Sequence, residues 1–270
     1  MKMKKIAMMI AGTALGVTML SGCGGSKEKA VITSVNDLPG KTIGVQLGTT
    51  GDDIATDYEK KPESGNAAAK VERYSKGADA VNALKQNKLD CVLIDNEPAK
   101  AFVAANDDLK IIEGAFEKED YAMAVKKGNS ELVDKLNKAI KELQDDGTIK
   151  KILDNYIGDN KGSFQYTSPE GTDRSNGKLV MATNAAFYPY ETLENGKVVG
   201  IDPDIMQAVC DKLGMTLEIE DMEFEAIIPA VQSGKADVGV AGMTVDETRL
   251  QSVDFTDSYA QGLQVIIVKK

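Results

Sequence analysis

Short apolar runs and amphipathic segments alternate along most of this chain, which is the pattern of a mixed α/β protein. In the first half, residues 42–47 (TIGVQL) and 89–94 (LDCVLI) predict buried strands. After Ser130 an apolar residue recurs every three or four positions, which predicts an amphipathic helix, and Gly147 is placed to end it. The other elements expected in this half are strands at 71–74, 110–113 and 121–126 and helices at 76–86, 99–105 and 149–156, with a further helix beginning near Asp52.

The alternation returns in the second half, after a polar stretch. Residues 158–177 (GDNKGSFQYTSPEGTDRSNG) are rich in Gly, Ser, Asn and Asp, which is typical of an exposed linker. Beyond it, residues 236–240 predict another buried strand, and residues 187–190 (FYPY) predict an aromatic loop. The other expected elements are strands at 178–183, 216–220 and 263–268 and helices at 200–213 and 225–232.

Two pairs of segments are similar to each other across this linker. ADAVNALKQNKLDCVLID (78–95) and EAIIPAVQSGKADVGVAG (225–242) share a helix, a lysine-bearing turn, an aspartate and a buried strand. GKTIGVQ (40–46) and GKLVMAT (177–183) each begin a half with Gly-Lys and a strand. The repetition predicts two similar α/β lobes whose strands are mainly parallel.

The carboxyl ends of the predicted strands carry polar, aromatic or bare backbone groups. These ends are residues 46–51, Asp95, residues 184–187 and residues 241–244. In α/β lobes, ligand groups gather at such strand ends, and a cleft between lobes is a favoured binding site. We therefore expect the four segments to share one cleft.

Residues 235–249 (KADVGVAGMTVDETR) contain the components of a carboxylate-binding site. A buried strand ends there in a turn of small residues, Thr244 supplies a hydroxyl, and Arg249 supplies a guanidinium that can bind a carboxylate through two parallel hydrogen bonds. In the other half, the Gly-Thr turn at 48–51 directs backbone amides and a helix N-terminus toward one point, which favours an anion. These features predict a small ligand that bears a carboxylate.

Composition narrows the function classes. The formal net charge is −10, and without Lys2, Lys4 and Lys5 it becomes −13, with 29 basic against 42 acidic residues. Such an acidic surface argues against nucleic acid or an anionic membrane surface as the main partner. The chain has no histidine, which excludes histidine-based acid–base catalysis and histidine metal sites. Cys91 and Cys210 lie in apolar segments and fit buried small side chains, with a disulfide between them as the alternative.

The N-terminus has the pattern of a leader. Residues 1–22 begin with lysines and continue with an apolar run that is too short to span a bilayer comfortably. The run ends in Leu-Ser-Gly-Cys, which resembles the lipobox of bacterial lipoproteins. By that resemblance Cys23 becomes an acylated (palmitate-type) N-terminus, residues 23–29 form a tether, and the protein is extracytoplasmic and lipid-anchored to the cell membrane. The alternative is an ordinary signal peptide with a chance cysteine.

Several linked segments together resemble one protein family. They are GVQLGTTGD (44–52), VLIDNEPA (92–99), ATNAAFYPYE (182–191), GIDPDIMQAV (200–209), MEFEAIIPAVQSGKADVGVAGMTVDETR (222–249) and VDFTDSYAQG (253–262). The family is that of the solute-binding proteins of polar amino-acid ABC importers, and the resemblance covers nearly all of residues 30–157 and 177–270. It implies a two-lobed α/β fold of the periplasmic-binding-protein type II class that closes on an amino acid at a hinge.

The resemblance also implies roles for individual residues. Arg249 is expected to bind the ligand α-carboxylate as a bidentate pair, helped by Thr244 and the amide of Thr50. Asp95 is expected to bind the α-ammonium group. A backbone carbonyl of Ala241 or of Gly242 is expected to assist it. Without the resemblance, Arg249 reads as a surface arginine and Asp95 as a helix cap.

Four further residues are expected to contact the ligand side chain. Phe187 and Phe224 form aromatic walls, with plain core packing as the alternative. Asn184 and Gln46 match positions that set specificity, and both are uncharged here. If Arg249 and Asp95 neutralise the two charges of the ligand backbone, an uncharged pocket prefers a neutral polar side chain. A glutamine-like ligand is thus expected first and cystine next.

Two alternatives to this ligand and function remain. A basic amino acid fits if Glu191 or Glu225 approaches the cleft. A same-fold enzyme of the dehydratase type needs a positioned acid, for which an ion-paired Asp95 is a poor candidate. The resemblance implies a binding protein and not an enzyme, with a membrane permease and its ATPase as partners. We expect a monomer that needs neither a cofactor nor a metal.

The order of the segments departs from the family. In the family, the segment similar to 178–270 comes first and the segment similar to 30–157 follows it. We therefore expect a circular permutation, with one lobe at 30–124, a hinge strand and helices at 125–157 that pack on the other lobe, a linker at 158–177 and the other lobe at 178–270. A rearranged pair of gene fragments is the alternative. The permuted order predicts one covalent crossing of the hinge, at 124–127, where the family has two.

Overall fold

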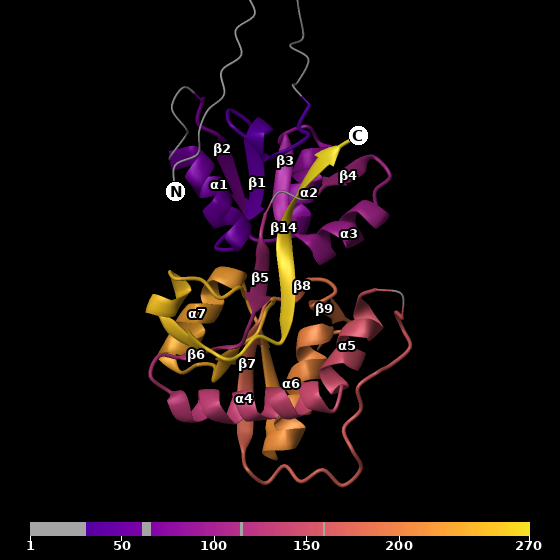
Figure 1. Ribbon diagram of the computed structural model, residues 1–270, viewed down its shortest axis with the longest axis vertical. Helices are drawn as coiled ribbons and strands as arrows, with labels where there is room; N and C mark the ends of the chain where they lie inside the picture. The colour runs from indigo at the N-terminus through magenta and orange to yellow at the C-terminus, as the bar shows by residue number, and fades with distance from the viewer. Residues whose placement is uncertain (1–30, 61–65, 114–115, 159) are drawn as a thin grey trace, which may run out of the picture. The chain divides into compact units, whose positions relative to one another are not determined.

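The computed structural model describes residues 31–60, 66–113, 116–158 and 160–270. The expected leader, Cys23 and the tether lie outside the described residues. The rest forms an α/β protein with two main sheets and one small sheet (Figure 1). No helix in the described ranges is both long enough and apolar enough to cross a membrane.

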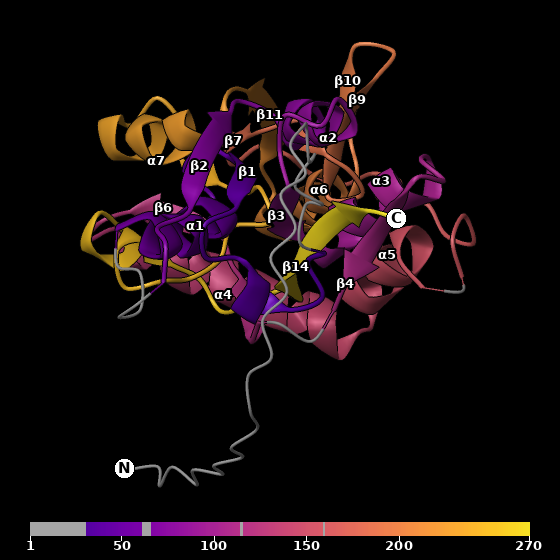
Figure 2. The same cartoon turned by 90° about the horizontal axis from the view of Figure 1, so that it is seen from above.

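The first sheet has the strand order β2-β1-β3-β14-β4, and β5 pairs with β14. Its strands are β1 (Thr42–Gln46), β2 (Lys70–Tyr74), β3 (Cys91–Asp95), β4 (Leu109–Ile112), β5 (Lys118–Tyr121) and β14 (Ala260–Lys269). The 3-10 helix η1 (Val35–Asp37) precedes β1, and the α-helices are α1 (Thr50–Lys60), α2 (Gly77–Lys85) and α3 (Asn96–Ala104). In Figure 2, β1, β2 and β3 run beside one another, in agreement with their parallel pairing.

The second sheet has the order β11-β7-β12-β6-β13. Its strands are β6 (Ala124–Lys126), β7 (Lys178–Thr183), β11 (Thr216–Asp221), β12 (Val238–Gly239) and β13 (Val253–Phe255). Its helices are α4 (Ser130–Asp145), α5 (Thr148–Tyr156), α6 (Ile201–Leu213), α7 (Phe224–Ser233) and the 3-10 helix η2 (Arg249–Gln251). The small sheet is β10-β9-β8, formed by β8 (Ala186–Phe187), β9 (Glu191–Glu194) and β10 (Lys197–Val199).

Alternation of side chains along the strands builds a separate core on each face of the main sheets. In β3, Leu93 belongs to one cluster of buried residues and Val92 to another. In β7, Met181 and Ala182 divide between two clusters in the same way. Successive strand residues point to opposite faces, so strands covered on both sides read as continuous apolar runs. This explains why these strands could be predicted from hydrophobicity alone.

The prediction of mainly parallel strands is only half right. Parallel pairing is confined to β2-β1-β3 and β11-β7-β12. The strands β14 and β6 each pair antiparallel with the parallel half of their sheet. The chain enters β6 from β5 of the first sheet and enters β14 from β13 of the second sheet. Each of the two strands therefore runs opposite to the parallel strands of the sheet that it joins.

Two further expectations about these crossing segments are wrong. The single strand expected at 121–126 is two strands, because the chain leaves β5 at Tyr121 and begins β6 at Ala124 in the other sheet. The strand expected at 263–268 belongs to the first sheet, as the longer β14. The chain therefore passes between the sheets twice, at β5–β6 and at β13–β14, and not once as the permuted order predicted.

The described residues of the polar segment 158–177 are exposed or half-buried, and several of their side chains bond to α6. Arg174 and the hydroxyl of Tyr166 both bond the carboxylate of Asp211, the latter at 3.0 Å. Asn176 donates from Nδ2 to the Leu213 carbonyl at 2.8 Å. The small sheet and β13 were not predicted, because their strands are only two to four residues long. Cys91 and Cys210 are both buried free thiols, as expected, and the alternative of a disulfide between them is wrong.

Candidate functional site

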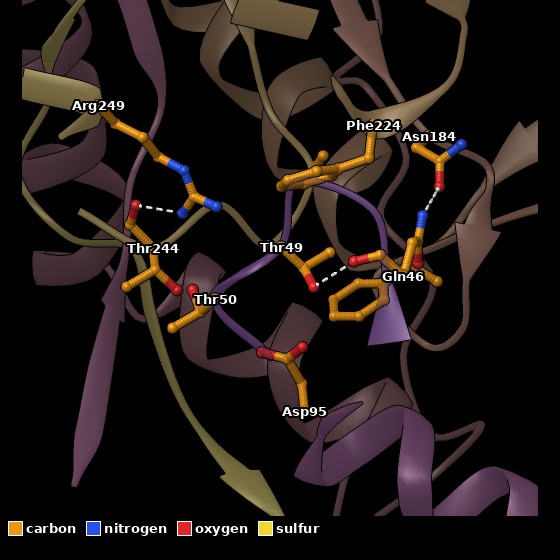
Figure 3. Close-up of a pocket in the computed structure, with 11 residues that line it drawn as sticks. Gln46, Thr49, Thr50, Asp95, Asn184, Phe224, Thr244 and Arg249 are labelled. Atoms are coloured by element: carbon orange, nitrogen blue, oxygen red, sulfur yellow. Dashed lines mark hydrogen bonds between the residues drawn. The ribbon is translucent and has the colours of Figure 1, made fainter. Parts of the chain in front are cut away.

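One pocket collects all ten residues predicted to bind a ligand, together with Thr49 (Figure 3). Its cavity has a volume of about 10 Å³, which is room for about one water molecule. Its lining comes from strand ends, loops and helix starts of both lobes. The lining residues are Gln46, Thr49, Thr50, Asp95, Asn184, Phe187, Phe224, Ala241, Gly242, Thr244 and Arg249.

The pocket lies where parallel strands end. Gln46 is the last residue of β1 and Asp95 the last of β3, while Asn184 directly follows β7. Ala241 and Gly242 follow β12 after one residue. The carboxyl ends of parallel strands meet at one edge of a sheet, so the strand directions alone bring the polar groups at these ends together.

Arg249 carries the positive charge of the pocket and is held in place from both lobes. Its side chain donates from Nη1 to the Thr244 carbonyl at 2.8 Å and from Nη2 to the Gly48 carbonyl at 3.0 Å. Its Nε lies 3.2 Å from the carboxylate of Asp246, and its guanidinium lies 5.5 Å from the ring centroid of Phe224. The residue is only 7% exposed. A guanidinium whose rotamer is set by these contacts is preorganised to bind an anion.

Asp95 carries a negative charge into the same pocket. Its carboxylate accepts hydrogen bonds from the Tyr121 hydroxyl and from Gln264 Nε2, the latter at 2.9 Å. Burial raises the pKa of Asp95, and these two donors oppose that rise. Hydrogen bonds to the ionised form keep a buried carboxylate available for a cation.

Glu119 is a second carboxylate beside this group, and sequence reasoning missed it. It accepts from Thr244 Oγ1 at 2.8 Å and from Gln264 Nε2 at 3.3 Å, so Gln264 bridges it to Asp95. Burial, followed by the negative charge of Asp95, raises the pKa of Glu119 to about 7. The expected strand at 121–126 began too late to include Glu119, and no motif in the sequence singles it out.

The far end of the pocket is polar but uncharged. Gln46 donates from Nε2 to Asn184 Oδ1 at 2.9 Å, and Asn184 Nδ2 donates to the Met222 carbonyl at 2.8 Å. In Figure 3 this amide pair lies on the opposite side from Arg249 and Thr244, with Phe224 between them. The site thus has a charged end and an amide end.

The turn at Ala241-Gly242 forms a backbone wall of the pocket. Gly242 has a φ of +52°, and a Cβ added to it would lie 2.6 Å from Phe187 Cε1. Only glycine fits this combination of a left-handed backbone and a close aromatic ring. The Gly242 amide donates to Asp202 Oδ2 at 2.8 Å, which fixes the turn from behind.

The start of α1 forms the remaining wall. Thr49 donates from Oγ1 to the Gln46 carbonyl at 2.8 Å, and Asp52 accepts from the Gly48 amide at 3.0 Å. These bonds order the turn, and Thr50 is the first residue of the helix. The positive end of the helix dipole therefore points at the pocket, which favours an anion there.

The two glutamates considered for a basic ligand do not line the pocket. Glu191 is fully buried beside Asp202, and Glu225 lies at the start of α7, its Cβ 3.2 Å from where a Gly48 Cβ would stand. The described residues hold no group of three or more histidine, cysteine, aspartate or glutamate side chains arranged for a metal. The geometry is that of a small, charged, two-ended binding site.

A family model places this chain among known proteins. The model for bacterial extracellular solute-binding proteins, family 3, matches residues 50–159 and 179–270. The chain belongs to this family.

Individual relatives match shorter stretches. The chain is 35% identical over 104 residues to the arginine-binding extracellular protein ArtP of Bacillus subtilis, a match that covers 38% of this chain and 41% of the relative. It is 30% identical over 132 residues to the L-cystine-binding protein TcyJ of Escherichia coli, covering 48% of this chain and 47% of the relative. A solved ancestral arginine-binding protein bound to arginine is 48% identical over 29% of this chain and 35% of its own, with a TM-score of 0.29. Each match thus spans less than half of the relative's length.

Proposed function

We propose that this protein binds a free amino acid outside the cytoplasm and delivers it to an ABC permease with its ATPase. The observation that carries the proposal is the pairing of Arg249 and Asp95, two side chains of opposite charge that line one pocket from different lobes. An amino acid is a zwitterion, so its carboxylate fits the guanidinium and its ammonium fits the carboxylate. Hydrogen bonds to charged groups contribute about 1.5–3 kcal/mol each, so a few of them suffice for micromolar affinity.

The amide end of the pocket supports a neutral polar side chain. Gln46 and Asn184 offer hydrogen-bonding groups without net charge. A glutamine-like side chain matches such groups directly, and cystine, with its second amino-acid end, comes next. An unpaired cationic side chain would be costly to bury against uncharged amides alone.

A basic amino acid is the second candidate, and Glu119 is the observation that favours it. Asp95 and Glu119 together outnumber the single cation Arg249 among the charged groups around the pocket. A site with excess negative charge attracts a ligand with net positive charge. The arginine-binding relatives agree with this second choice.

A thermal-shift screen against the standard amino acids plus cystine tests the proposal. Stabilisation by at least one amino acid, lost in R249K, is expected, because a ligand that binds only the folded state raises its stability. No shift with any of them would overturn amino-acid binding. Calorimetry with glutamine and arginine then decides between the two candidates. Recovery of the ligand unchanged after incubation supports binding without chemistry over a dehydratase-type reaction.

Two finer parts of the proposal concern the anchor and the order of segments. The lipid anchor on Cys23 predicts that globomycin, an inhibitor of lipoprotein signal peptidase, shifts the protein to its unprocessed size. The absence of a shift would contradict the anchor.

Circular permutation is supported by Ile32 and Val268, which lie in one hydrophobic cluster although they are far apart in sequence. In an unpermuted relative, the segments that correspond to Val268 and Ile32 follow each other, and their proximity here means that a short connection could join them. One cooperative unfolding transition, shifted as a whole by ligand, is expected of a permuted protein, whereas separate transitions would favour a rearranged fragment pair.

A further inference from the structure

Two carboxyl groups lie in complete burial directly behind the Gly242 turn. Glu191 begins β9, and Asp202 lies in the first turn of α6, both with 0% exposure. Asp202 Oδ2 accepts the Gly242 amide at 2.8 Å and the Tyr259 hydroxyl at 2.9 Å. The backbone holds the two residues side by side, because the Asp202 amide donates to the carbonyl of Tyr190, the residue before Glu191, at 3.0 Å. Each carboxyl accordingly affects the pKa of the other.

Three oxygens of this pair have no hydrogen-bond donor among the described groups. They are Asp202 Oδ1 and both carboxyl oxygens of Glu191. Buried carboxylate oxygens are almost always satisfied, and each unsatisfied one is costly. Two ionised carboxylates side by side in a buried site add mutual repulsion to that cost. A proton on one of them removes the repulsion and supplies the missing donor.

We propose that Glu191 is protonated at neutral pH and donates its proton to Asp202 Oδ1, so that the ionised Asp202 holds the Gly242 turn of the pocket. The two oxygens of Asp202 then have separate tasks. Oδ1 accepts from Glu191, and Oδ2 accepts from Gly242 and Tyr259. Asp202 acts on the pocket through Gly242, and Glu191 acts through Asp202, so both are positioning residues.

The surroundings assign the proton to Glu191 and not to Asp202. Asp202 receives two donors that favour its ionised form, whereas Glu191 has none. Burial and the negative charges of Asp202, Asp221 and Asp95 raise the pKa of Glu191 well above its ordinary value. Burial raises the pKa of Asp202 to about 6, which leaves it ionised at neutral pH. The neighbouring hydroxyls of Tyr190 and Tyr259 belong to groups whose pKa values burial also raises, so they stay neutral.

Infrared spectroscopy of the whole protein tests the protonation state directly. A protonated carboxyl group has a C=O stretching band that is separate from the bands of ionised carboxylates. We expect the wild-type minus E191Q difference spectrum at neutral pH to contain this band. The wild-type minus E194Q difference spectrum should lack it, because E194Q is a matched control at the exposed glutamate of the same strand. A difference is needed because Glu119, whose pKa is about 7, is itself partly protonated at neutral pH. A wild-type minus E191Q spectrum without the band would overturn the proposal.

Hydrogen exchange at the Gly242 amide, followed by NMR, tests the positioning role. E191Q keeps a donor for Asp202 without a titrating proton, so protection of the amide should stay at the wild-type level. E191A leaves Asp202 Oδ1 unsatisfied, and exchange at Gly242 should become about tenfold faster. Equal protection in E191A and the wild type would contradict the role, and so would loss of protection in E191Q. Neither measurement needs a ligand, so both stand apart from the proposed function.

Discussion

Gln46 and Asn184 are hydrogen-bonded to each other across the pocket, with 2.9 Å between Gln46 Nε2 and Asn184 Oδ1. The two residues come from different sheets, at the ends of β1 and β7. Asn184 is held in one orientation, because its Nδ2 donates to the Met222 carbonyl. The pair therefore has two consequences: it joins the lobes, and it presents a fixed amide surface to the side chain of a ligand.

The coupling between these amides can be measured without ligand. In a double-mutant cycle of Q46A and N184A, we expect the two single changes to be non-additive by about 1 kcal/mol of unfolding free energy, the usual net value of one hydrogen bond. Urea denaturation of the four proteins gives this coupling energy. Strict additivity would mean that the bond is not formed in solution and that the amides act independently.

Arg249 should be far less replaceable than other arginines of this chain. A lysine keeps the charge but loses the planar fork that reaches Thr244 and Gly48, and with it bidentate binding of a carboxylate. We expect R249K to weaken amino-acid binding about 100-fold, equivalent to about 3 kcal/mol. Isothermal titration calorimetry measures the change, with R73K as the control, because Arg73 pairs with Asp52 and Glu59 outside the pocket. Equal losses in the two variants would point to general destabilisation.

Much of the fold could be predicted because it depends on local patterns. The buried strands β1, β3 and β7 are mostly continuous apolar runs. Helix α4 has local signals at both ends, with Asn129 before it and Gly147 after it. What failed was the assignment of β14 to the correct sheet and the separation of β5 from β6. Hydrophobicity predicts that a segment is a strand, but which sheet it joins depends on long-range pairing that local sequence does not encode.

The site was predictable to the extent that strand ends carry it. Most predicted ligand residues lie at or just after the end of a strand or at the start of a helix, and Thr244 lies in the loop between β12 and η2. Glu119 and Glu191 could not be assigned correctly, for one shared reason. Glu119 depends on Thr244, which is 125 positions away in the sequence, and the role proposed for Glu191 depends on Asp202, which lies on a different element.

Gly262 in β14 has no room for a side chain beside the paired strand β5. A Cβ there would lie 2.0 Å from the hydroxyl oxygen of Tyr121 on the paired strand β5. We expect G262A to lower the free energy of unfolding by about 1–3 kcal/mol, as for other overpacked sites, and to move the Tyr121 hydroxyl away from Asp95. Chemical denaturation and binding assays measure the two effects. The neighbouring change Q261A removes only an exposed hydrogen bond to Asp120, so it should lower the free energy of unfolding by less than about 1 kcal/mol and leave binding unchanged.

The pH dependence of binding should reveal Glu119. Its pKa is raised to about 7 in the folded protein, from an ordinary value of 4.5. Because a ligand ammonium group favours the ionised carboxylate, affinity should fall as the pH is lowered from about 8 to about 6, and binding at pH 7 should release a fraction of a proton. Stability without ligand has the opposite sign. A raised folded pKa means that the stabilising contribution is complete below about pH 4.5 and is lost as the pH rises through about 7.

Calorimetry in two buffers of different ionisation enthalpy measures this released proton. The groups that face Glu119 are Asp95, Arg249, Thr244 and Gln264, and only the two charged ones affect its titration electrostatically. E119Q should abolish the proton release and flatten the affinity profile near neutral pH, whereas D120N, at an exposed neighbour on β5, should change neither. If E119Q keeps the wild-type profile, the titrating group is Asp95, whose pKa is also raised by burial, and Glu119 serves only to orient Thr244. If E119Q also weakens arginine more than glutamine, the added charge of Glu119 selects a basic ligand.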